Sequence, residues 1–357
     1  MSPSEHQEAR QPTQHGTLHE GDAPKIEKYF KALIKVGGSD LHIKAGAPAH
    51  MRTQTLIRAT TGEALTPRMV EEMTAELLDE KQTAFFDENG SIDLAYEIAG
   101  EDRFRINVFR QRGNISLAVR RVTRDIPDFE TLHLPAVMEQ IANIHQGLIL
   151  LSGPTGCGKS TTIASMLEHV NKTRRCHIVT IEDPIEYLYV DKKALVNQRE
   201  IGIDVPTFQS ALKYLMREDP DVVLIGELRD RETFQAALQA SETGHVVFGT
   251  VHASGAPQTI TRILDLFDIE SRSLTRQSLA FNLQAIICQK LLPCIAEDID
   301  RIPAVEVLLT SPSVRQLIHE ARDVELIEVI RTSAEQGMQD FTDSLVALID
   351  KELVDPR

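Results

Sequence analysis

Residues Gly153 to Ser160 read G-P-T-G-C-G-K-S and directly follow the apolar run from Gly147 to Leu151. This is the full spacing of a phosphate-binding P-loop, in which glycines let backbone N–H groups converge on phosphates beside a helix N-terminus. In this pattern Lys159 reaches the β- and γ-phosphates and the Ser160 hydroxyl ligates Mg²⁺. The alternative is a chance glycine-rich turn. We predict nucleoside triphosphate binding by Gly153, Pro154, Thr155, Gly156, Cys157, Gly158, Lys159, Ser160 and Thr161.

Length and composition limit the class of protein. A chain of 357 residues is longer than one hydrophobic core usually serves, so two domains are expected. No apolar stretch reaches the roughly 20 residues of a membrane helix, and the polar first residues do not form a signal peptide, which predicts a cytoplasmic protein. The four cysteines form no C-x-x-C pair, and a net charge of −15 disfavours a nucleic-acid partner.

Periodicity divides the chain into a disordered tail (1–23), a small α+β domain (24–122), a linker (123–135) and a second domain (136–357). In the first domain we expect an amphipathic helix after Pro24 and one helical stretch from Pro67 to Phe86. Short strands are expected over 41–44, 49–52, 92–98, 104–109 and 115–119.

The second domain alternates strands with helices. Strands are expected over 148–151, 177–181, 222–225 and 246–251, with helices over 159–171, 207–217, 231–241 and 256–266. The strands are continuous runs of Val, Ile and Leu, which predicts a parallel sheet buried on both faces. Beyond Ser271 the chain is expected to be mostly helical, apart from a strand over 304–309 and a last helix over 338–353.

Carboxylates follow two of the expected strands. Glu182, Asp183 and Glu186 cluster after the second strand, at the sheet edge where α/β folds place ligands, although a solvated acidic loop is the alternative. The third strand ends in Gly226 and Glu227, with glycine where a magnesium-coordinating aspartate usually stands. Glu227 is therefore a better candidate for polarising water than for binding the metal ion directly.

His245 and His252 flank the fourth strand. Residues seven apart cannot share one face of a regular strand, so His252 is expected past the strand end, where it suits sensing of the γ-phosphate. A structural role is favoured for His245. Neither histidine has a third ligand at the spacing of a metal site.

Arginines concentrate in the first domain of this otherwise acidic chain. Phe104, Ile106 and Val108 alternate with Arg103 and Arg105, which predicts a strand with one apolar and one basic face. The next strand repeats this pattern, with Arg120 on the basic side. Such a face is either a solvated surface or a grip on phosphate that supplies charge to a transition state.

These residues together resemble the secretion and pilus motor ATPases, most closely the type IV pilus retraction ATPases of the PilT/PilU family, over residues 24–355. The matches are the P-loop, an Asp box over 181–187, a Walker B segment over 225–230 and a His box over 243–252. The resemblance implies an α/β protein with an N-terminal PAS-like α+β domain and a C-terminal RecA-like P-loop ATPase domain. It also implies ATP and Mg²⁺ as ligands, with ATP between the two domains, and sensor or finger roles for Arg105, Arg112 and Arg120.

Family membership further implies a homohexamer at the inner-membrane base of the pilus, in contact with a platform protein and with a paralogous retraction or assembly ATPase. Glu227 is the expected base, with Glu186 as the alternative. Pilus assembly and type II secretion ATPases are rivals, but the chain lacks their N-terminal extension and their tetracysteine motif after the His box. A PilU-like accessory ATPase and a regulatory subunit without turnover are two further hypotheses.

Overall fold

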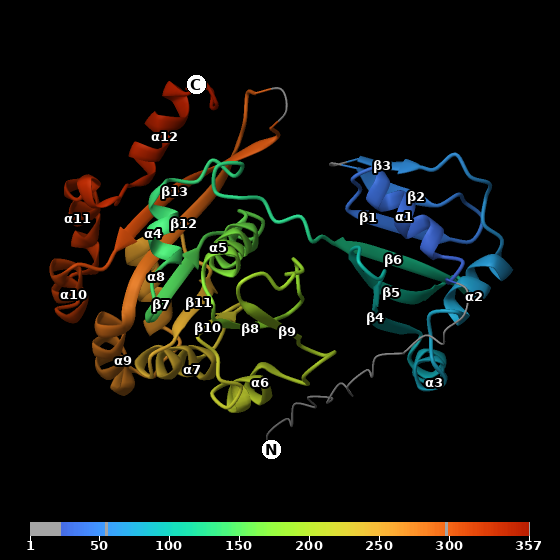
Figure 1. The fold of residues 1–357 in the computed structure, drawn as a ribbon, viewed down its shortest axis with the longest axis horizontal. Helices are drawn as coiled ribbons and strands as arrows, with labels where there is room; N and C mark the ends of the chain where they lie inside the picture. The colour runs from blue at the N-terminus through green and yellow to red at the C-terminus, as the bar shows by residue number, and fades with distance from the viewer. Residues whose placement is uncertain (1–22, 54–55, 297–298, 357) are drawn as a thin grey trace, which may run out of the picture. The chain divides into compact units, whose positions relative to one another are not determined.

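The computed structural model describes residues 23–53, 56–296 and 299–356, which form two units (Figure 1). The first unit comprises residues 23–125 together with the later segments Ile185–Leu188 and Gly202–Asp204. The second unit contains the remaining described residues. Apart from Ala23, the tail predicted over 1–23 lies outside the described residues.

The first unit is an antiparallel sheet with helices against it. Its strand order is β3-β2-β1-β6-β5-β4. The strands are β1 (Asp40–Lys44), β2 (His50–Thr53), β3 (Leu56–Ala59), β4 (Ser91–Glu97), β5 (Arg103–Gln111) and β6 (Asn114–Val122). The helices are α1 (Glu27–Lys35), α2 (Pro67–Ala75) and α3 (Glu80–Asn89).

Alternation along β5 builds the core of this unit, as the sequence predicted. Phe104, Ile106 and Val108 are buried in this core, where the Phe104 ring stacks on Phe30 of α1 with centroids 4.4 Å apart. The intervening polar residues of β5 are only partly buried. The expected single helix from Pro67 to Phe86 is wrong: Asp79 caps a second helix, α3, through a capping box with Gln82.

The second unit is a mixed sheet between two layers of helices (Figure 1). Its strand order is β13-β12-β7-β11-β10-β8-β9, and within the described residues all neighbours are parallel except β12 and β13. The strands are β7 (Gly147–Ser152), β8 (His177–Glu182), β9 (Leu195–Glu200), β10 (Val222–Ile225), β11 (Val246–Val251), β12 (Leu283–Pro293) and β13 (Arg301–Leu309).

Both faces of this sheet are covered, as the continuous apolar strands predicted. In β7, Leu148 and Leu150 pack on one side, whereas Ile149 and Leu151 pack on the other. One face is covered by α4 (Val137–Ala142) and α5 (Lys159–Thr173). The other is covered by α6 (Phe208–Leu215), α7 (Arg231–Glu242), α8 (Ala256–Leu264), α9 (Ile269–Asn282), α10 (Pro312–His319) and α11 (Leu326–Thr332).

Two strands of the second unit were not predicted. The segment Leu283–Pro293 was expected to be helical, yet it forms β12 beside β7 and pairs with β13 as a long antiparallel ribbon. The polar segment Leu195–Glu200 forms the edge strand β9. Two short turns, η1 (Asp323–Glu325) and η2 (Ala334–Gln336), and the last helix α12 (Phe341–Asp350) complete the unit.

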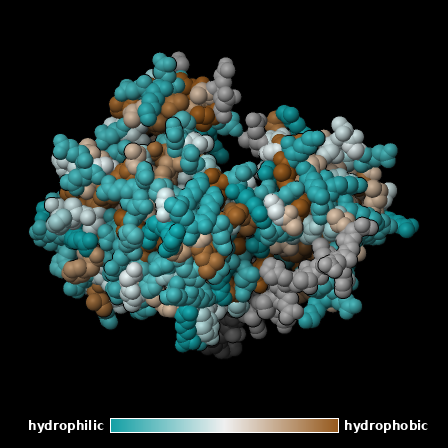
Figure 2. Space-filling view, in the orientation of Figure 1, coloured by the Kyte–Doolittle hydropathy of each residue, from teal (hydrophilic) through white to brown (hydrophobic). Residues whose placement is uncertain are grey.

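The surface of the second unit is mainly hydrophilic on the side shown in Figure 2. Hydrophobic side chains gather where α12 packs on the outer parts of β12 and β13. Ile302 and Leu348 are buried in this small cluster, while Ile295 and Val346 are exposed near it. The unit boundary falls after Asp125, so most of the expected linker, residues 126–135, belongs to this unit.

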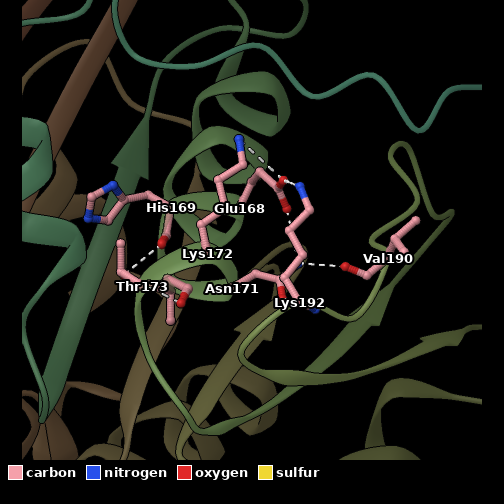
Figure 3. A network of polar contacts seen from close by, with 8 residues as sticks. Glu168, His169, Asn171, Lys172, Thr173, Val190 and Lys192 are labelled. Carbon is pink, nitrogen blue, oxygen red and sulfur yellow. Dashed lines mark hydrogen bonds and ion pairs between the residues drawn. The ribbon is translucent and has the colours of Figure 1, made fainter.

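A buried polar network fixes α5 to the segment after β8 (Figure 3). The Asn171 side chain is fully buried, donates to Glu168 Oε2 (3.0 Å) and Val190 O (2.9 Å), and accepts from Lys192 N (3.1 Å). Glu168 also forms ion pairs with Lys172 and Lys192. This network lies near the C-terminal end of α5, the helix that begins directly after the P-loop. It therefore anchors the end of that helix that is far from the loop.

Replacing Asn171 with leucine is expected to lower the free energy of unfolding of the second unit by about 3 kcal/mol, because three hydrogen bonds of a fully buried amide are lost and the buried Glu168 carboxylate loses a donor. Urea unfolding followed by circular dichroism measures this. The matched control is Thr173→Ala on the same helix, whose exposed hydroxyl only bonds backbone carbonyls of α5. The control should change stability by less than about 0.5 kcal/mol. Equal stability of both variants would contradict the anchoring role.

Candidate nucleotide-binding and hydrolysis site

The carboxyl ends of four parallel strands carry the predicted site residues. Ser152 at the end of β7 pairs with Val251 of β11, and Ile225 at the end of β10 pairs with both Gly249 and Ile181. The P-loop, His252, Glu227 and Glu182 therefore lie at one edge of the sheet. This is the edge at which open α/β sheets bind ligands.

The P-loop backbone has the shape that its glycines predicted. Gly156 and Gly158 have φ of 76° and 88°, in the left-handed region that favours glycine. The loop ends where α5 begins at Lys159, so the first N–H groups of that helix point toward the loop. The Cys157 thiol lies inside the loop, and burial raises its pKa above the ordinary value.

Lys159 is buried inside the loop. Its ammonium group donates to Gly153 O (2.8 Å) and Pro154 O (3.1 Å). A buried ammonium whose partners are neutral carbonyls is the kind of group that an anionic phosphate would satisfy better. Ser160 follows in the first turn of α5. Both residues lie where the P-loop pattern predicted.

Glu227, Arg229 and His252 form one polar cluster after β10 and β11. His252 Nε2 lies 3.1 Å from Glu227 Oε1, and Arg229 Nε donates to Glu227 Oε2 over 2.6 Å. Arg229 also lies 3.9 Å from Asp183 of the Asp box. His252 comes directly after the last residue of β11, which confirms the prediction that it sits past the strand end. The pairing places a carboxylate and an imidazole side by side.

Gly226 lies close to β8, where a larger residue would need the backbone to shift by a few tenths of an ångström. A Cβ there would lie 3.2 Å from Ile181 O, and Gly226 N donates to that same carbonyl over 2.8 Å. Thr250 of β11 binds the same turn from the opposite side. Its hydroxyl donates to Gly226 O (2.6 Å), and its carbonyl oxygen accepts from Leu228 N (3.0 Å). Neighbouring strands on both sides thus fix the backbone that carries Glu227.

The remaining carboxylates differ in their surroundings. Glu182 is buried, and its Oε1 accepts hydrogen bonds within the sheet from the Thr180 hydroxyl (2.7 Å) and the Gln198 amide (3.1 Å). Glu186 is exposed and lies in Ile185–Leu188, which packs with the first unit, where Leu188 N donates to Thr123 O (3.0 Å). The three expected carboxylates therefore do not form one cluster.

His245 is not brought to this edge. It precedes β11, at the opposite end of the strand from His252. Its Nδ1 lies 3.0 Å from Ala240 O and 3.1 Å from the Thr243 hydroxyl, and its own carbonyl accepts from Gly147 N. These contacts are those of a structural histidine at the end of α7. They fit the structural role that the sequence favoured for His245.

The arginines of the first unit occupy two places. Arg105 and Arg120 are directly opposite each other on β5 and β6 and line a hollow of about 270 Å³ on the polar face of the sheet. Arg120 Nε lies 3.0 Å from Asp40 Oδ1, and Arg52 Nε lies 3.3 Å from the other oxygen of that carboxylate. Arg112 is exposed in the turn between β5 and β6, with φ of 50°.

Two residues of the site escaped sequence reasoning. Arg229 was noted only as part of the Walker B segment, whereas it joins Glu227 to Asp183. Gln289 lies behind the P-loop, in the strand β12 that was expected to be helical. Pairing between distant strands brings Asp183 near Arg229 and places Gln289 behind the P-loop, and spacing within the chain does not reveal such pairing.

The described residues contain no group of three or more His, Cys, Asp or Glu side chains able to hold a metal ion. None of the helices in the described part of the chain is long and apolar enough to span a bilayer.

Comparison with known proteins agrees with this geometry. The chain matches the family described as type II/IV secretion system protein over residues 26–349. It is 39% identical to the type IV pilus retraction ATPase PilT of Pseudomonas aeruginosa, over 92% of this chain and 95% of that protein. It is 37% identical to the type IV pilus ATPase PilU of the same organism, over 91% and 85% of the two chains.

The fold has the same relatives. A crystal structure of the pilus retraction motor PilT with bound ADP superposes with a TM-score of 0.85 at 39% identity, covering 94% of this chain and 95% of that chain. The ATPase DotB of Legionella pneumophila superposes with a TM-score of 0.76 at 25% identity, covering 97% of each chain. The resemblance to pilus motor ATPases is confirmed, and the chain belongs to the type II/IV secretion system protein family.

Proposed function

We propose that this protein is an ATP-hydrolysing motor that powers type IV pilus retraction, and with it twitching motility. The observation that carries the proposal is the meeting of a complete P-loop with the Glu227–His252 pair at one sheet edge. The similarity to PilT, and 38% identity to a twitching motility protein of Neisseria gonorrhoeae, support retraction as the use of that chemistry.

In this proposal the P-loop N–H groups and Lys159 hold the β- and γ-phosphates of ATP. The loop fits Mg²⁺ as well, because Ser160 offers a hydroxyl oxygen in the first turn of α5, and oxygen is the ligand that this hard cation prefers. When bound, Mg²⁺ neutralises negative charge on the phosphates. Ser160 would hold it.

Glu227 orients and deprotonates the attacking water. The water oxygen bonds to the γ-phosphorus as the bond to the β,γ-bridging oxygen breaks, so ADP and phosphate leave. His252 lies 3.1 Å from Glu227 and donates a hydrogen bond toward the γ-phosphate. Through this contact the presence of the γ-phosphate affects the Glu227 carboxylate. Glu186 is the alternative base, and Glu182, engaged by Thr180 and Gln198, supports the strand that positions Asp183.

We assign the first unit to a PAS-like domain and the second to a RecA-like domain. The arginines proposed to supply positive charge to the transition state, Arg105, Arg112 and Arg120, all belong to the first unit. Hydrolysis in a homohexameric ring would then drive opening and closing between subunits. The expected partners are an inner-membrane pilus platform protein and a paralogous retraction or assembly ATPase, with the ring peripheral at the cytoplasmic base of the pilus.

Steady-state phosphate release from the purified full-length chain tests the chemical part of the proposal. Turnover that depends on Mg²⁺ is the expected result. Nucleotide binding without any phosphate release, with and without a paralogous ATPase, would instead identify a regulatory subunit. A PilU-like accessory ATPase would hydrolyse ATP and yet fail to retract pili alone.

A further inference from the structure

A buried amide lies behind the P-loop. Cys288 of β12 pairs with Ser152 of β7 in parallel register, so Gln289 comes level with Gly153, where the P-loop leaves its strand. The Gln289 side chain is 3% exposed. It therefore faces the loop from the neighbouring strand, on the inside of the protein.

Both ends of this amide are engaged by the nucleotide-binding segment. Gln289 Nε2 donates to Cys157 O over 2.7 Å, and Gln289 Oε1 accepts from the Thr162 hydroxyl over 2.8 Å. A carbonyl oxygen only accepts, so the nitrogen of the amide must face Cys157. Thr162 then fixes the amide in that orientation from the first turns of α5.

The bond to Cys157 O sets the direction of the next N–H group. A peptide unit is planar and trans, so its C=O and N–H point in opposite directions. Because the Cys157 carbonyl points at Gln289, the Gly158 N–H of the same peptide points away from β12. That N–H is one of the P-loop donors expected to contact phosphate.

The loop is also pressed against Gln289. A Cβ at Gly153 would lie 2.5 Å from Gln289 O, and a Cβ at Gly158 would lie 2.7 Å from Gln289 Nε2. Only glycine fits such a close approach at these two positions. The glycine spacing of the motif therefore also accommodates the strand behind it, in addition to the nucleotide in front.

We propose that Gln289 is a positioning residue for nucleotide binding: its amide holds the Cys157–Gly158 peptide with the N–H turned toward the phosphates. The inference rests on the proposed binding of ATP by the P-loop. It concerns affinity more than the chemical step, because the loop holds the phosphates in the ground state and in the transition state alike.

The test compares Gln289→Met, which keeps the length of the side chain and removes both polar ends, with the wild-type full-length chain. We expect the Kd for ADP and the KM for ATP to rise about tenfold or more, as for one lost hydrogen bond to a charged group, while kcat changes less than about threefold. Thr162→Val frees the amide and should raise both constants in the same direction. Thr162→Ser keeps the hydroxyl and should leave the Kd for ADP and the KM for ATP near the wild-type values.

The matched control is Gln82→Leu in the first unit, which removes another buried amide that bonds to the backbone: Gln82 Oε1 accepts from Asp79 N at 3.0 Å in the capping box of α3. It should lower the melting temperature and leave the Kd for ADP unchanged. Wild-type affinity in folded Gln289→Met and Thr162→Val proteins overturns the inference. If Gln289→Met does not fold, unchanged affinity in Thr162→Val alone overturns it. Absence of ADP binding in the wild type would instead overturn the proposed function.

Discussion

Lys159→Ala is expected to lower the affinity for ATP at least about a hundredfold and to abolish hydrolysis. The wild-type ammonium is buried within the P-loop, where the neutral carbonyls of Gly153 and Pro154 accept its hydrogen bonds. A phosphate in reach of this group gains charge-assisted hydrogen bonds at low local dielectric, worth about 1.5–3 kcal/mol each. Titration with a fluorescent ATP analogue measures the affinity, and phosphate release measures the turnover.

The control for this variant lies on the same helix. Lys172→Ala removes an exposed lysine of α5 that pairs with Glu168 at 3.4 Å, on the far end from the P-loop. Its affinity for ATP should equal that of the wild type. Full hydrolysis by Lys159→Ala would contradict the assignment of the P-loop to nucleotide binding.

Glu227→Gln is expected to bind ATP normally and to lose turnover by a factor of about 10² to 10⁴, the usual contribution of a general base. Glutamine keeps the size of the side chain and one oxygen that can accept the hydrogen bond from Arg229, but it cannot accept a proton. Pre-steady-state and steady-state phosphate release, together with the Kd for a slowly hydrolysed ATP analogue, separate the two effects.

Two further carboxylate variants sharpen this result. Glu232→Gln changes an exposed carboxylate in the first turn of α7 and should keep wild-type turnover. Glu186→Gln tests the alternative base. If Glu227→Gln hydrolyses ATP well and Glu186→Gln does not, the base is Glu186, and the pair formed by Glu227 and His252 has a structural role.

The sequence predicted the strand, loop and helix of the P-loop segment well because its information is local. The P-loop spacing, the apolar run before it and the helix after it lie within a short stretch of chain, and the structure has each in place. The same holds for His252, whose position past β11 follows from the two-residue repeat of a strand.

Pairing between distant segments was the part that could not be predicted. The segment Leu283–Pro293 follows α9 without any breaker, and its apolar run fits a buried helix as well as a strand. The segment is a strand because it pairs with both β7 and β13, which the sequence alone does not show. Gln289 was missed for the same reason. In contrast, the break at Asp79 had a local sign, the capping box with Gln82, that the apolar periodicity of the flanking helices masked.

The carboxylates illustrate a second limit. The sequence analysis grouped Glu182 and Glu186 because both follow the second strand, yet the first is buried in the sheet and the second is exposed in a segment that belongs to the first unit. A short loop can reverse the surroundings of neighbouring side chains. Proximity in sequence was therefore weaker evidence than the register of β8 and β10, which aligns Ile181 with Ile225 just ahead of Glu227.

The most direct test of the proposed function is a count of surface pili by electron microscopy in a strain from which the gene for this chain is deleted. Retraction and assembly motors change that number in opposite directions. A retraction motor predicts excess pili and loss of twitching, both reversed by the wild-type gene and not by the Lys159→Ala variant. Bare cells would contradict retraction and indicate an assembly motor, and an unchanged number of pili with normal twitching would contradict a role in pilus movement.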